Sequence, residues 1–137
     1  MGLFFNISNN NIINEVTIKG KELGFTYDIE LASRTTGHIR VKVIKRLRKE
    51  KLCLVSIGMD KGKIRKFYEH ELFKELSKNE QKRIERFVML NWDIVCDCYV
   101  HNLDQGVAAN MIKQRVAQYN KECMKNGRKD EMIWARC

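Results

Sequence analysis

The sequence predicts an α+β fold, in which an antiparallel β-meander of about four strands in the amino-terminal half is followed by two or three helices packed on one face. Apolar and polar residues alternate with a period of two in much of residues 1–58, whereas apolar residues recur at helical spacings through residues 63–127. A strand-rich segment followed by a helix-rich one is typical of this fold class. Since the chain has 137 residues, we expect one domain spanning residues 1–137, with a docked tail at residues 128–137.

The first predicted hairpin joins residues 15–20 to residues 25–31 through a turn at residues 21–24. Both segments alternate apolar with polar residues, which is the pattern of half-buried strands. The alternation places four apolar residues of the second strand on one face, namely Phe25, Tyr27, Ile29 and Leu31. Residues 1–12 are expected to form either another edge strand or a loosely docked arm.

A second hairpin is predicted to join residues 39–43 to residues 52–57. Its first strand alternates three inward residues with two outward cations, in the order Ile39, Arg40, Val41, Lys42, Val43. In its second strand, Leu52, Leu54 and Ser56 are expected to alternate with Cys53, Val55 and Ile57. Residues 45–51 connect the two strands, and their sequence is strongly basic. We therefore expect the tip of this hairpin to carry a concentrated positive charge.

Helical periodicity begins at Lys63 and predicts a first helix. Its apolar stripe consists of Ile64, Phe67, Tyr68, Leu72 and Leu76. A second helix is expected to begin after Ser77, because Ser77 and Glu80 have the spacing of a capping box. This second helix is apolar on more than one side, which indicates a central position between the sheet and another helix.

A third helix is predicted to begin at the N-cap Asp104 and to end near Gly127, which favours a left-handed stop. After it, Ile133 and Trp134 are expected to dock the tail onto the body, because an apolar pair of this size rarely stays in water.

The positive charge of the chain is concentrated in one segment. Residues 34–66 hold twelve Lys and Arg against only Glu50 and Asp60, a net charge of +10. The rest of the chain holds fourteen basic and fifteen acidic residues, so the whole chain has a net charge of +9. Like charges in such a cluster repel one another, which favours a binding role over an ordinary solvated surface. The alternative is a solvated edge strand on which cations discourage pairing with other chains.

The basic segment predicts a small non-enzymatic protein that engages nucleic-acid phosphates. Lys and Arg neutralise phosphates, and a two-stranded ribbon fits the major groove of DNA. The candidate binding residues are Arg34, Arg40, Lys42, Lys45, Arg46, Arg48, Lys49, Lys51, Arg65 and Lys66. Because residues 34–66 contain no aromatic residue, base stacking would require Phe67, Tyr68 or the first hairpin.

A second hypothesis is an inhibitor or adaptor directed at a protein. In that case the same ribbon fills an acidic or nucleic-acid-binding groove of a larger enzyme. The chain lacks proline and is rich in Ile, Lys and Asn, a bias that indicates an AT-rich genome and is common among phage accessory proteins of the anti-defence type. The expected partner is thus nucleic acid or an acidic or nucleoprotein surface. A symmetric homodimer through Trp92 or Trp134 is also conceivable.

A third hypothesis is a metal-assisted nuclease built on Asp93, Asp97 and His101. These residues are spaced at i, i+4 and i+8, so they share one helical stripe, and Asp97 can orient the imidazole of His101. Side chains in such a stripe are about 6 Å apart along the axis and rarely converge on one ion. We therefore favour a solvated Asp–His pair and predict no catalytic residue, metal or cofactor.

The other nucleophiles and ligands also favour structural roles. Five cysteines form an odd set without framework or zinc-finger spacing, and the expected state is reduced thiols in the cytoplasm. His38 lies in a polar turn, where it could bind phosphate with Arg34 and the turn amides, but a solvated histidine is the simpler interpretation. No apolar run approaches the roughly 20 residues of a membrane span, and no signal peptide or myristoylation pattern is expected.

Overall fold

The computed structural model describes the backbone of residues 16–35 and 37–133, and the side chains of residues 16–31 and 37–133. Its elements are β2 (Thr17–Ile18), the 3-10 turn η1 (Gly20–Glu22), β3 (Asp28–Thr35), β4 (His38–Leu47), β5 (Glu50–Asp60), β6 (Lys63–Glu69), α1 (Glu71–Lys74), α2 (Lys78–Val100), α3 (Gln105–Lys125) and the 3-10 turn η2 (Lys129–Glu131). The predicted α+β fold is confirmed. The sheet has five strands rather than about four, in the order β2-β3-β4-β5-β6, and every neighbouring pair is antiparallel.

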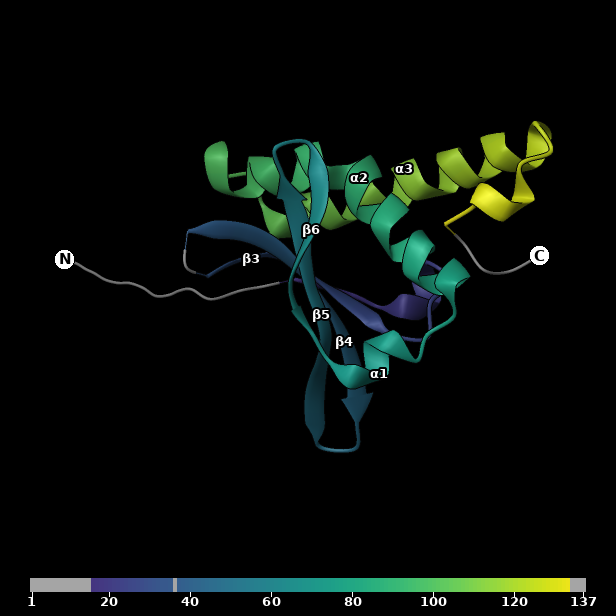
Figure 1. Cartoon of the computed structure of the whole chain (residues 1–137). Coiled ribbons are helices and arrows are strands. Elements are labelled where there is room, and N and C mark those ends of the chain that lie inside the picture. Colours follow the sequence, from purple (N-terminus) through teal and green to yellow (C-terminus); the bar gives the residue numbers. More distant parts are fainter. Residues whose placement is uncertain (1–15, 36, 134–137) are drawn as a thin grey trace.

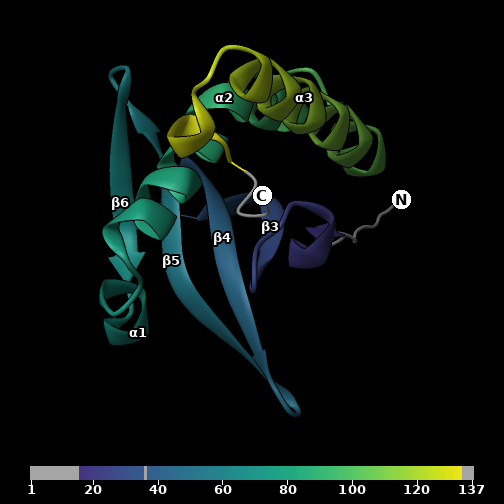
Figure 2. The same cartoon turned by 90° about the vertical axis from the view of Figure 1, so that its right-hand side faces the viewer.

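Helices α2 and α3 lie together on one side of the sheet (Figures 1 and 2). The strand residues on that side are inaccessible to solvent, and they include Ile29, Val41, Val43, Val55 and Ile57. Residues opposite one another in a ladder share a face, so Lys42, Ser56 and Tyr68 lie in one row on the other side. We call that side of β4, β5 and β6 the outer face.

Residues 63–69 form strand β6 and not the first helix that their spacing predicts. The chain reverses at Lys61 and Gly62, whose φ angles are 53° and 77°, as in the two-residue hairpin turns that suit twisted strands. The following residues then pair with β5, through Asp60 with Lys63 and Met59 with Ile64. Helical spacing also arises by chance in a short segment, and here pairing with a neighbouring strand overrides it. The first helix, α1, begins only at Glu71.

A bulge interrupts the pairing of β5 with each of its neighbours, β4 and β6. On β5, Leu54 is an extra residue between the positions that pair with Val43 and Ile44, so the predicted alternation of residues 52–57 fails. Leu54 and Val55 are neighbours in the chain, and both are buried. On β6, Phe67 is the extra residue between the partners of Ser56 and Ile57.

The predicted helix boundaries after α1 are confirmed. Ser77 Oγ accepts a hydrogen bond from the Glu80 amide at 3.1 Å, and Asp104 Oδ2 accepts one from the Val107 amide at 3.1 Å. Gly127, with φ of 72°, follows α3 in the left-handed conformation. Ile133 is completely buried, as predicted, whereas Trp134 and residues 1–12 lie outside the described residues.

Candidate nucleic-acid interface

The hairpin of β4 and β5 projects beyond the body of the molecule, at the bottom of Figure 1. Its turn consists of Arg48 and Lys49, and Arg48 has a φ of 48°, an unusual backbone conformation for a residue with a side chain. Within the described part of the chain, Lys45, Arg48 and Lys49 make no ion pair. All three are exposed, so the tip presents three cations to solvent.

The two cations at the base of this tip are neutralised by carboxylates of β3. Arg46 Nε lies 3.0 Å from Asp28 Oδ2, and Lys51 Nζ lies 2.9 Å from Glu30 Oε2. Arg46 and Lys51 are directly opposite in the ladder, where unpaired like charges would destabilise the hairpin. The sequence count of charges in residues 34–66 does not include either acid. The hairpin is therefore close to neutral at its base and positive at its tip.

Asp28 is the anchor of this arrangement. Partial burial opposes its ionisation, but hydrogen bonds from the Gly20 amide at 2.9 Å and from Arg46 keep the pKa of Asp28 below its ordinary value. The carboxylate thus stays charged at neutral pH and ties the β4–β5 hairpin to the turn at η1.

A second group of cations surrounds an aromatic ring on the outer face. The guanidinium carbons of Arg40 and Arg65 lie 4.4 and 4.7 Å from the centre of the Phe67 ring. The His38 ring lies 5.0 Å from the same ring. At these distances each guanidinium is attracted to the ring quadrupole, which restricts its position. We call His38, Arg40, Lys42, Arg65, Phe67 and Tyr68 the outer-face platform.

The sequence prediction missed this platform because it placed Phe67 and Tyr68 on a helix. No aromatic residue occurs within residues 34–66, but β6 brings Phe67 beside Arg40, which is 27 positions earlier in the chain. The available signal was Gly62, because a short glycine-containing turn directly after a predicted strand is typical of a hairpin.

Of the remaining candidate residues, Lys66 joins neither group. Lys66 lies 3.4 Å from Glu69 Oε2 and 5.5 Å from the centre of the Phe73 ring of α1. Lys45 belongs to the tip but lines a small recess with Leu72 and Leu76, so it faces the side of α1. The side chain of Arg34 lies outside the described residues. The structure thus divides the predicted single ribbon into a tip, a platform and scattered cations.

The described cysteines beside these groups lack the features of nucleophiles. Cys53 lies between Lys42 and Glu30, and partial burial raises the pKa of its thiol. Burial and the neighbouring carboxylates likewise raise the pKa of Cys96 and of Cys98. A raised pKa keeps each thiol protonated at neutral pH, and a protonated thiol is a poor nucleophile.

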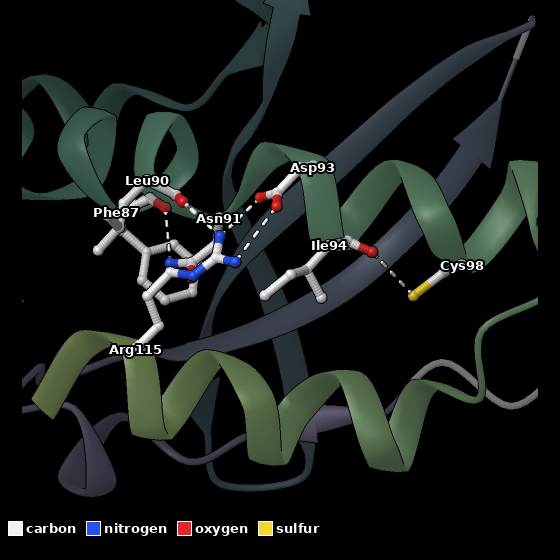
Figure 3. A network of polar contacts seen from close by, with 7 residues as sticks. All are labelled: Phe87, Leu90, Asn91, Asp93, Ile94, Cys98 and Arg115. Atoms are coloured by element: carbon white, nitrogen blue, oxygen red, sulfur yellow. Dashed lines mark hydrogen bonds and ion pairs between the residues drawn. The ribbon is translucent and has the colours of Figure 1, made fainter. Parts of the chain in front are cut away.

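The three residues of the nuclease hypothesis form two separate pairs, one between Asp93 and Arg115 and one between Asp97 and His101. Arg115 of α3 donates to both carboxylate oxygens of Asp93, at 2.6 and 3.2 Å, and to the Leu90 carbonyl oxygen at 2.9 Å (Figure 3). His101 Nδ1 lies 3.0 Å from Asp97 Oδ1, in an exposed pair at the end of α2. Among the described residues, no three His, Cys, Asp or Glu side chains are grouped closely enough to hold a metal ion.

Arg115 instead connects α3 to α2. Its hydrogen bonds hold the pKa of Asp93 below the ordinary value, so the ion pair stabilises the fold above about pH 4, where Asp93 is also ionised in the unfolded chain. This contribution is lost as the pH falls through the lowered pKa. Because Asp93 is largely exposed, we expect it to be only about 0.5–1 kcal/mol.

The prediction is that Asp93→Asn lowers the free energy of unfolding at pH 7 by about 0.5–1 kcal/mol, and that the difference from the wild type disappears at low pH. Urea denaturation at pH 7, 5 and 3 measures it. Glu85→Gln, which removes a carboxylate of the same helix that makes no ion pair among the described residues, is the control. A difference that stays constant with pH would contradict the ion-pair explanation.

None of the helices in the described part of the chain has the length and hydropathy that a membrane crossing requires.

Comparisons with protein-family models, with curated proteins and with solved structures find no match to this chain.

Proposed function

We propose that this protein is a small non-enzymatic binding protein that engages nucleic-acid phosphates through the β4–β5 hairpin. The observation that carries the proposal is the projecting tip, where Lys45, Arg48 and Lys49 have no ion pair among the described residues. A two-stranded ribbon is narrow enough for the major groove, and free cations at its end can contact phosphates on the groove walls.

The backbone of the tip supports the same function. A non-glycine residue with positive φ, such as Arg48, costs roughly 1 kcal/mol relative to glycine. Glycine would therefore make a more stable turn, and Arg48 contributes a charge at that position. Asp28 and Glu30 hold the base of the hairpin in place, so the tip cations are presented on an ordered support.

The test is the salt dependence of binding to a labelled DNA duplex. Each phosphate contact contributes about 0.9 to the slope of log affinity against log salt concentration. The triple variant Lys45→Ala, Arg48→Ala, Lys49→Ala is expected to make the slope shallower by up to about 2.7 and to weaken binding at low salt. Fluorescence anisotropy across about 50 to 200 mM salt measures both.

The matched control removes three exposed lysines of the helices, through Lys82→Ala, Lys121→Ala and Lys125→Ala. It changes the net charge by the same amount, so it separates a local contact from the effect of total charge. Equal slopes for the two triple variants would refute a binding role for the hairpin tip.

A gain of binding is expected from the double variant Asp28→Asn, Glu30→Gln. It releases Arg46 and Lys51 from their carboxylates and should steepen the slope by up to about 1.8. The side-chain amide introduced at position 28 keeps an oxygen acceptor for the Gly20 amide, so the turn at η1 is preserved.

A protein target is the second candidate, and the observation that favours it is Leu47. This residue is 42% exposed between Arg46 and Arg48, and an apolar side chain gains nothing from phosphates but is buried against a protein. Leu47→Ser is expected to leave duplex affinity unchanged. A purified partner that binds the wild type after nuclease treatment, and that loses affinity for Leu47→Ser, would favour the inhibitor or adaptor function.

A further inference from the structure

The outer face of β4, β5 and β6 is not covered by α2 and α3, and it carries aromatic and basic groups in a fixed arrangement. Helices α2 and α3 cover the opposite side of the sheet (Figures 1 and 2). On the outer face, the Tyr68 side chain is 47% exposed. An exposed ring on a sheet surface offers a flat apolar platform to a ligand with a planar ring of its own.

The cations around this ring are positioned before any ligand binds. Phe67 holds the guanidinium groups of Arg40 and Arg65 at 4.4 and 4.7 Å from its centre, so part of their conformational freedom is already lost. Arg65 also pairs with Asp60 at 3.0 Å, but both side chains of that pair are nearly half exposed, and an exposed pair exchanges readily for another anion.

Lys42 and Ser56 complete the row that includes Tyr68. Lys42 pairs with Ser56 across the ladder, and Ser56 pairs with Tyr68, so the amine, the hydroxyl and the ring share the outer face. The Ser56 hydroxyl is buried and makes no hydrogen bond within the described residues.

We propose that the outer-face platform binds single-stranded nucleic acid, with an unpaired base stacked on Tyr68 and adjacent phosphates bound by Arg40, Lys42 and Arg65. The inference rests on the proposed function, since it assigns a substrate class to the same basic surface. A base in a duplex is stacked on both sides and offers no free ring face, whereas an unpaired base does.

The spacing along β4 supports a path for a single strand. Arg40 and Lys42 lie on one face of β4, about 6.6 Å apart, and Arg46 lies about 13 Å beyond Lys42, with the buried Ile44 between them and its guanidinium paired with Asp28. The row leads from the platform toward the hairpin tip. A strand whose base stacks on Tyr68 can therefore extend its phosphates along β4 to Arg48 and Lys49.

The experiment compares four labelled probes by fluorescence anisotropy: oligothymidylate and oligouridylate of about 12 nucleotides, a DNA duplex of the same length, and heparin. The wild type is expected to bind one or both single strands more tightly than the duplex. The two single-stranded probes distinguish DNA from RNA as the source of the unpaired base. The affinity for heparin measures the attraction to a polyanion that has no bases.

Tyr68→Leu removes the ring but keeps an apolar side chain on the strand and leaves the charge unchanged. It is expected to weaken single-strand binding about 5- to 150-fold, with the same salt slope and the same affinity for duplex and heparin. Tyr68→Phe should retain wild-type binding because it keeps the ring. Met89→Ala, which removes an exposed apolar side chain of α2, is the control. Circular dichroism of each variant verifies the fold.

The outcomes separate this inference from the proposed function. If Tyr68→Leu bound single strands with unchanged affinity, the platform would be overturned and the hairpin function would stand. The same conclusion would follow if the wild type bound duplex and heparin with the same affinity as single strands. A wild type that binds none of the nucleic-acid probes would overturn both. Equal loss of affinity for all four probes in Tyr68→Leu would show general damage to the sheet and also overturn the stacking role.

Discussion

Replacing Gly20 with alanine is expected to lower the free energy of unfolding by about 3 kcal/mol, at the upper end of the usual cost of overpacking. A Cβ atom at this position would lie 2.0 Å from the Tyr27 carbonyl oxygen and 2.8 Å from that of Phe25. Both are backbone atoms, so no side chain can rotate to make room. Because the Gly20 amide also binds Asp28, we expect the support of Arg46 to loosen as well.

Thermal and urea unfolding of Gly20→Ala measure this loss, which corresponds to a fall of about 10 °C or more in the melting temperature. Gly62→Ala is the control: Gly62 has a positive φ of 77° but open space around its Cα, so only a backbone cost of about 1 kcal/mol is expected. Equal losses in the two variants would show that the turn at η1 moves to accommodate the methyl group.

The second large effect is expected for Phe87→Ala, with a loss of about 3–5 kcal/mol. Phe87 is completely buried near the middle of α2, and its ring meets the Phe25 ring edge to face with the centres 6.2 Å apart. Removing the Phe87 ring leaves a cavity between α2 and the segment that contains Phe25. A small domain has only about 5–15 kcal/mol of stability, so this variant should be partly unfolded at moderate temperature.

Phe87→Leu preserves most of the volume and is expected to lose less than about 1.5 kcal/mol. Urea denaturation of both variants gives the two values. If Phe87→Ala lost no more than Phe87→Leu, α2 would have to close the cavity by moving toward the sheet. The nucleic-acid affinity of the folded fraction should be the same in both variants, because neither change touches the outer face or the hairpin tip.

Local signals in the sequence predicted the helical half of the fold well. Ser77 and Asp104 are caps whose side chains bind amides three residues away, so a few neighbouring residues contain the whole interaction. The first helix was wrongly predicted because pairing with β5, across the two-residue turn at Lys61 and Gly62, decides the state of residues 63–69. The bulges at Leu54 and Phe67 were also beyond prediction, since they depend on the register of two strands together.

In the candidate site, too, some features are visible in the sequence and others depend on contacts in the folded structure. The excess of Lys and Arg in residues 34–66 is visible in the sequence, and it predicted a basic hairpin. Which cations remain available depends largely on contacts between strands, since Asp28 and Glu30 of β3 neutralise Arg46 and Lys51 of the β4–β5 hairpin. A count along the chain includes charges by position, whereas an ion pair depends on distances in space.

By itself, then, the sequence determined the α+β class, the N-caps of α2 and α3, the end of α3, and the segment that carries the positive charge. These features depend on periodicity, composition and contacts between near neighbours in the chain. Only the tertiary structure decided that β6 is a strand, that Phe67 lies between Arg40 and Arg65, and that the tip retains Lys45, Arg48 and Lys49 as its unpaired cations among the described residues. The physical reason is that strand pairing joins residues far apart in the chain, and no local pattern specifies its register.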